Sequence, residues 1–113
     1  MKLAIYSDVF KDSGFIDDLI ASKVVSIEDI VFLHSGNLVK KRKEISCVGH
    51  FLFLNLCINS IGMKFAEYLV GEGKIIYATP GDLVRYSARG VNFLIQTGNA
   101  RMVTCAQDMI CIK

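Results

Sequence analysis

Residues 45–58, I-S-C-V-G-H-F-L-F-L-N-L-C-I, decide the fold of this chain. The centre of the stretch, residues 51–54, is apolar with no polar alternation. A strand that is apolar on both sides must be covered on both faces, so the stretch predicts the middle strand of a parallel sheet. A buried helix is the alternative. The aromatic content and a helix start at Asn59 or Ser60 favour the strand.

Working outward, the pattern predicts strands on either side of this stretch and helices between them. Ser13 and Ser60 are placed to cap helices by accepting a backbone N–H. The order strand, helix, strand predicts parallel neighbours joined by right-handed crossovers. The expected strands are residues 2–6, 30–33 and 74–78, and the expected helices run from 13 to 22 or 23 and from 60 to 71. We expect one α/β domain over residues 1–113.

The last third of the chain carries a different pattern. Thr79-Pro80 predicts the start of a short helix that ends near Arg89-Gly90. Residues 91–96 then alternate between two faces, 97–99 read as a glycine-containing turn, and 100–105 alternate again. This pattern predicts a β-hairpin. The predicted fold class is therefore α/β, with a mostly parallel sheet, helices on both faces and a C-terminal antiparallel β-hairpin.

The composition limits the kinds of partner that we expect for this chain. The net charge of +2 is too small to imply nucleic acid, and the 52% of hydrophobic residues predicts that some apolar surface faces a protein partner. The run at 45–58 is shorter than the roughly 20 residues that span a bilayer, so no transmembrane segment is expected. The opening M-K-L-A-I-Y-S-D shows no export signal. The sequence as it stands predicts a cytoplasmic protein, or a periplasmic one if a leader has been removed.

Motifs for catalysis are weak. The sequence has no glycine-rich phosphate loop, and the cysteine spacings do not match a metal site, so we expect neither a cofactor nor a metal, and an enzyme is not supported. Polar residues do follow the predicted strands, where open α/β sheets bind ligands. They are Asp8, Asn55, Asn59 and Thr79. They support an alternative function as a small-molecule or nucleotide-binding enzyme.

The basic run at residues 40–43, K-K-R-K, has two interpretations. The simpler one is a solvated loop or helix face. The functional one is a weak site for phosphate or an acidic lipid.

The order of elements, with R-G-V-N-F at 89–93 followed by a turn at Gly98 and by Arg101 and Val103, resembles the YfiR-like family over residues 2–105. The resemblance implies a regulatory domain that binds and inhibits a membrane diguanylate cyclase, with cysteine oxidation tuning the regulator. The first functional hypothesis is accordingly a regulatory protein-binding module in signalling. A third hypothesis is an assembly subunit of a larger machine.

Two further predictions concern the C-terminal third. The hairpin leaves an open edge where we expect a homodimer or a partner strand to pair, through Val91, Phe93, Ile95, Arg101 and Val103. Cys105 and Cys111 are separated by five residues, which permits a disulfide if 106–108 form a turn. The family resemblance also implies a cysteine pair near this end. The alternative is that all four cysteines stay reduced.

Overall fold

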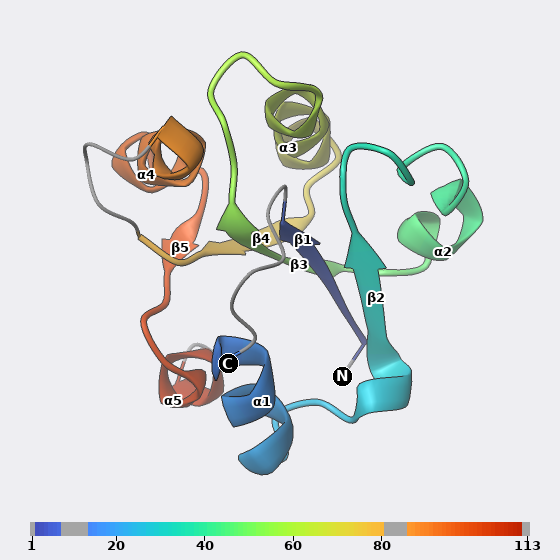
Figure 1. Cartoon of the computed structure of the whole chain (residues 1–113), viewed down its shortest axis with the longest axis vertical. Coiled ribbons are helices and arrows are strands. Elements are labelled where there is room, and N and C mark those ends of the chain that lie inside the picture. Colours follow the sequence, from blue (N-terminus) through green and yellow to red (C-terminus); the bar gives the residue numbers. More distant parts are fainter. Residues whose placement is uncertain (1, 8–13, 81–85, 112–113) are drawn as a thin grey trace.

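The computed structural model describes residues 2–80 except 8–13, and residues 86–111. Its centre is a sheet of five parallel strands in the order β2-β1-β3-β4-β5 (Figure 1). The strands are β1 (Leu3–Ser7), β2 (Ile30–Leu33), β3 (His50–Asn55), β4 (Ile75–Ala78) and β5 (Arg101–Met102).

Helices cover both faces of this sheet. One face carries α1 and α5, and the other carries α2, α3 and α4 (Figure 1). The bounds are α1 (Gly14–Ala21), α2 (Arg42–Ser46), α3 (Ile61–Gly71), α4 (Arg89–Gln96) and α5 (Ala106–Cys111), with short 3-10 turns at Ile27–Asp29 and Tyr86–Ala88. No helix in the described ranges has the length and apolar character needed to cross a membrane.

The prediction that residues 48–56 form a central strand is confirmed. Leu52 and Phe53 are both fully buried, and they belong to two different hydrophobic clusters on opposite faces. The strand is shorter than the apolar stretch that predicted it. Residues 42–46 form α2 before it, and residues 56–60 form the loop that leads into α3. The apolar run therefore marks the core of the molecule rather than one element.

The predicted C-terminal antiparallel hairpin is wrong. Its first half forms α4, and its second half contributes only the two residues of β5, which pairs with β4 in parallel. Val91 and Leu94 are buried three residues apart, which is helical spacing, whereas Phe93 is exposed. The alternation of residues 91–96 thus also fits a helix with one buried side. All strand pairs in the described part of the chain are parallel.

Two glycines allow α3 and α4 to approach the centre closely. A Cβ at Gly62 would lie 2.2 Å from the buried Tyr6 hydroxyl, and a Cβ at Gly90 would lie 2.5 Å from the backbone oxygen of Leu56. Neither approach is compatible with a larger residue unless its surroundings move. Leu56 is thereby fixed between the two helices at the end of β3.

Candidate functional site

The strand order reverses direction between β1 and β3. The chain passes from β1 to β2 on one side and from β3 through β4 to β5 on the other. In open parallel sheets, ligands bind outside the carboxyl ends of the strands at such a reversal. Two polar side chains meet there: the Nδ2 of Asn55 donates a hydrogen bond to the Oγ of Ser7, over 3.1 Å.

The end of β1 is built differently from the rest of the strand. The register with β3 shifts between Tyr6 and Ser7, so Ser7 pairs with Asn55 across an irregularity. Such bulges bend the strand and redirect side chains near functional sites. Ser7 is only 1% exposed, and within the described residues it is the only polar residue that falls in the buried class. Asp8, the predicted site residue that follows it, lies outside the described residues.

Asn59 and Thr79 are also at this edge. Thr79 follows β4, where its Oγ1 donates to the backbone oxygen of Leu54 and its N–H donates to that of Phe53. Asn59 is exposed in the loop after β3, in the left-handed region with φ of 61°. The structure therefore places Asn55 and Thr79 at the carboxyl ends of the neighbouring strands β3 and β4, with Asn59 in the loop after β3. Their role in binding a ligand stays a prediction.

The loop from β3 to α3 is held from both sides. Ser60 caps α3 by accepting the N–H of Met63 at 3.1 Å, and its own hydroxyl donates to the Cys57 carbonyl. On the α4 side, the Gly90 N–H donates to the Leu56 oxygen over 2.8 Å. The amino end of α3, with its partial positive charge, thus lies at a fixed position beside the reversal point.

Tyr86 and Arg89 extend this edge, and the sequence did not indicate them. The Tyr86 hydroxyl donates to the Ile58 oxygen at 3.4 Å, and the ring is 57% exposed. The Arg89 guanidinium lies 5.6 Å from the centre of that ring. The only available signal was an aromatic residue three positions before an arginine, a common pattern. Together they present a flat aromatic surface beside a cation.

The residues predicted for association do not form one surface. Val91 and Val103 are fully buried and Ile95 is half-buried, whereas Phe93 and Arg101 are exposed. The hairpin edge that would have joined them is absent, because residues 91–95 belong to α4. Association with another chain stays a prediction, but the hairpin edge predicted for it does not exist, so another edge would have to provide the contact.

The cysteines differ from a set of buried thiols. Cys47 and Cys105 are exposed, and Cys57 is partly exposed. Cys105 precedes α5 and Cys111 is its last residue; the side chain of Cys111 lies outside the description. A helix separates two Cα atoms six residues apart by about 9 Å, beyond the roughly 4.4–6.8 Å of a disulfide. The predicted bridge remains a prediction, and it requires the last turn of α5 to unwind.

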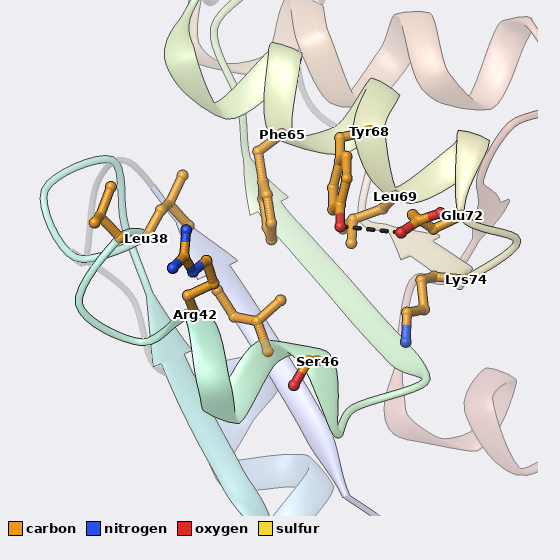
Figure 2. Close-up of a pocket in the computed structure, with 10 residues that line it drawn as sticks. Leu38, Arg42, Ser46, Phe65, Tyr68, Leu69, Glu72 and Lys74 are labelled. Carbon is orange, nitrogen blue, oxygen red and sulfur yellow. Dashed lines mark hydrogen bonds between the residues drawn. The ribbon is translucent and has the colours of Figure 1, made fainter.

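A hollow of about 320 Å³ lies elsewhere, between α2 and the carboxyl-terminal half of α3 (Figure 2). It lies near the start of β3 and β4 rather than at their carboxyl ends, since Lys74 directly before β4 lines it. Of this region the sequence indicated only the basic run. No group of three or more His, Cys, Asp or Glu side chains suited to a metal occurs in the ranges that the structure describes.

The fold defines a class: a doubly wound parallel α/β domain with the flavodoxin-like strand order 2-1-3-4-5. Among solved structures, the chain is similar to DNA processing protein A (DprA) from Streptococcus pneumoniae, with a TM-score of 0.65 and 13% sequence identity. The match covers 97% of this chain and 60% of the other, so this chain spans somewhat less than two thirds of that protein. At this identity the likeness shows the fold alone.

No protein-family model and no curated protein matches the sequence. The resemblance to the YfiR-like family is wrong. Its most telling residues, 89–103, form α4 and a short parallel strand instead of a hairpin, and the structural neighbour is a different protein.

Proposed function

We propose that this domain binds a nucleotide, or the nucleotide unit of a nucleic acid, at the carboxyl ends of β1, β3 and β4. One observation carries the proposal. Ser7 is buried at the reversal point of the sheet, and Asn55 from the neighbouring strand donates a hydrogen bond to it. The bond from Asn55 offsets the cost of burying the Ser7 hydroxyl, and the pair stands where parallel α/β domains bind their ligands.

The surroundings of this pair match the parts of a nucleotide. The amino end of α3 has backbone N–H groups and a partial positive charge, which favour a phosphate. The Tyr86 ring is 57% exposed, and the Arg89 guanidinium lies over one of its faces, so a base would stack on the remaining face or on the guanidinium. The exposed Asn59 amide lies in the loop between these two parts. Phosphate and base would therefore lie on opposite sides of the β3–α3 loop.

The name of the structural neighbour describes a protein that processes DNA, and a nucleotide is the chemical unit of DNA. The overall charge of +2 had argued against nucleic acid. That argument applies to long polyanions, whose binding depends on neutralising many phosphates. One or two nucleotides require only a few donors at one edge. We therefore propose recognition of a single unit or a short strand, and no catalytic step.

The test is an amide NMR titration of the intact protein with adenosine monophosphate, adenosine, inorganic phosphate and a short oligothymidylate. We expect the monophosphate or the oligonucleotide to shift the signals of Asn55, Asn59, Ser60 and Tyr86. Replacing Asn55 by Ala should weaken this binding about tenfold, because the Ser7–Asn55 pair at the binding edge is lost. Asn99→Ala, in the exposed turn after α4, is the matched control and should bind normally. Shifts confined to other surfaces, or none at millimolar nucleotide, would refute the proposal.

The second candidate is a protein-binding module, and the open edge of β2 favours it. β2 pairs only with β1 within the described residues, and Phe32 on it is 37% exposed. An exposed strand edge can pair with a strand of another chain. Sedimentation analysis over a wide concentration range tests self-association through this edge. We expect Phe32→Lys to abolish any dimer, whereas a protein that is monomeric throughout would exclude the homodimer.

A further inference from the structure

The geometry points to a second binding site, in which the pocket between α2 and α3 takes a small amphipathic anion: an apolar chain with a carboxylate or phosphate at one end. The site is separate from the proposed nucleotide edge, and the inference does not depend on that proposal. The shape of the pocket, its apolar walls and the Arg42 cation at its mouth support this site.

The pocket exists because its two helices differ in length. α2 has only 5 residues and α3 has 11, so α2 leaves part of the neighbouring helix uncovered. Phe65 and Tyr68 of α3 consequently line a hollow of about 320 Å³ (Figure 2). This volume is at the lower end of the roughly 300–1,000 Å³ of small-ligand pockets. It fits a short alkyl chain better than a large rigid molecule.

The walls of the pocket are apolar and firmly placed. Ile45 and Leu69 are buried, and Leu38 and Phe65 are half-buried. The ring of Phe65 packs edge-on against the ring of Phe51, with 6.0 Å between their centres. A wall that belongs to the core does not have to reorganise when a ligand enters. Burying an alkyl chain here gains roughly 0.8 kcal/mol per methylene.

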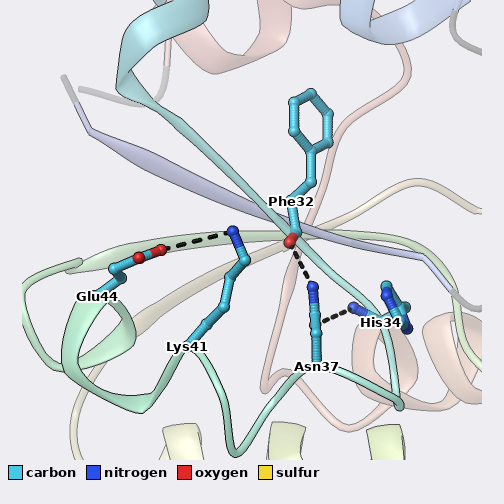
Figure 3. A network of polar contacts seen from close by, with 5 residues as sticks. All are labelled: Phe32, His34, Asn37, Lys41 and Glu44. Carbon is cyan, nitrogen blue, oxygen red and sulfur yellow. Dashed lines mark hydrogen bonds and ion pairs between the residues drawn. The ribbon is translucent and has the colours of Figure 1, made fainter.

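The turn before α2 is equally fixed. The Oδ1 of Asn37 accepts the N–H of His34 at 2.9 Å, and its Nδ2 donates to the Phe32 oxygen at 3.0 Å (Figure 3). These bonds tie the turn to the end of β2, so the following residues Leu38 and Arg42 are already placed in the absence of ligand. Preorganisation of this kind favours binding.

Two cations line the pocket, Arg42 and Lys74, and no ion pair to either is found among the described residues. Lys41 forms an ion pair with Glu44 at 3.6 Å, and the ammonium of Lys74 donates to the Val48 oxygen at 3.0 Å. The Arg42 guanidinium rises from α2 beside the pocket, and no ion pair to it is found among the described residues (Figure 2). Its planar N–H groups match a carboxylate or phosphate. The basic run at 40–43 attracts the same ligands.

The Glu72 carboxylate also lines the pocket, but it does not conflict with an anionic head group bound at Arg42. It accepts a hydrogen bond of 3.0 Å from the Tyr68 hydroxyl, and Figure 2 shows it at the other end of the pocket from Arg42. Arg42 therefore stands alone at the α2 end of the pocket, whereas Glu72 and Lys74 both lie at the other end (Figure 2). A ligand with one anionic end and one apolar end would enter in a single orientation.

The test is a titration with ligands that separate the contribution of the apolar chain from that of the anionic head group. Decanoate and decyl phosphate carry both a chain and a head group. Decanol carries only the chain, and acetate and inorganic phosphate carry only the head group. Binding is followed by the NMR signals of Leu38, Ile45 and Leu69, which line the pocket. We expect decanoate or decyl phosphate to bind, decanol to bind more weakly, and the two head groups alone not to bind. Whichever of decanoate and decyl phosphate binds more tightly shows whether the site prefers a carboxylate or a phosphate head group.

Two single substitutions in α2 test whether the charge of Arg42 contributes to ligand binding. Arg42→Gln and Lys43→Gln each remove one positive charge from α2. We expect Arg42→Gln to weaken the decyl anions about tenfold and to leave decanol unchanged, because one charge-assisted hydrogen bond is lost. Lys43→Gln should bind as the wild type does. Equal losses in both variants, equal binding of decanol and decanoate, or binding only to anionic lipid vesicles would overturn the proposal.

Discussion

The two ends of the sheet differ in the kind of surface they offer. At the carboxyl end, Ser7 and Asn55 are hydrogen-bonded to each other beside the start of α3. At the opposite end, the pocket between α2 and α3 has apolar walls, with the cation of Arg42 at its α2 side. The first surface follows from topology, because parallel strands and the helices after them bring polar ends together. The second follows from the shortness of α2.

The largest expected effect comes from a residue that supports both ends. Phe53 is fully buried in the middle of β3, with its ring 5.2 Å from that of Tyr6 and 6.3 Å from that of Phe65. Phe53→Ala should lower the free energy of unfolding by about 3–5 kcal/mol, from a typical total of roughly 5–15. The measurement is the urea midpoint. Phe93→Ala, at a residue 43% exposed, is the control and should change it little.

A substitution with a smaller expected effect tests whether the two ends of the sheet respond independently. Gly90→Ala places a Cβ 2.5 Å from the Leu56 backbone oxygen, which cannot rotate away as a side chain does. We expect a loss of about 1–3 kcal/mol and shifted amide signals at the carboxyl edge, with the pocket signals of α2 unchanged. Gly71→Ala is the matched control. A Cβ there meets nothing within 4 Å, so stability should hold or rise. Equal stability of the two variants would show that α4 does not clamp the loop.

The sequence predicted the first two thirds of the fold well. The strands at 3–7, 30–33 and 75–78 agree with the predicted ones to within a residue or two, because short apolar runs between capped helices admit few alternatives. Residues 91–96 were mistaken for a strand, since six residues of mixed pattern fit both periods. The choice depends on a tertiary contact, the approach of Gly90 to Leu56, which no local pattern shows.

The candidate sites show the same difference between features that the sequence could predict and features that depend on tertiary contacts. Asn55 and Thr79 were predicted at a common edge because strand order alone brings them together. Tyr86 and Arg89 were missed, since their position depends on how α4 enters beside the β3–α3 loop. The pocket was missed because it depends on a difference in helix length, and the apolar residues that line it look like ordinary core residues in the sequence.

At the carboxyl end, the helix cap gives a moderate effect. Ser60→Ala removes the oxygen that accepts the Met63 N–H and the hydroxyl that donates to Cys57. We expect a loss of about 1 kcal/mol, measured by urea unfolding. Ser60→Asp keeps an acceptor for the N–H and should recover most of it. If Ser60→Ala were as stable as the wild type, the start of α3 would be fixed by Gly62 packing alone.

The smallest effect concerns the pocket end. The Tyr68 hydroxyl donates to Glu72, and this hydrogen bond, followed by the charge of the carboxylate and by burial, raises the pKa of the phenol above its ordinary value of 10.0. Glu72→Gln should bring that pKa back toward 10.0. The ring signals of Tyr68, followed by NMR against pH in the wild type and in Glu72→Gln, give the measurement. A raised pKa in the folded state means that the contribution to stability is present below the unfolded pKa and is lost as the pH rises through the folded pKa. The difference in stability between wild type and Glu72→Gln should therefore shrink only at alkaline pH, above about 10. A pKa of Tyr68 that is the same in both proteins would mean that the carboxylate does not hold the phenol at the pocket mouth.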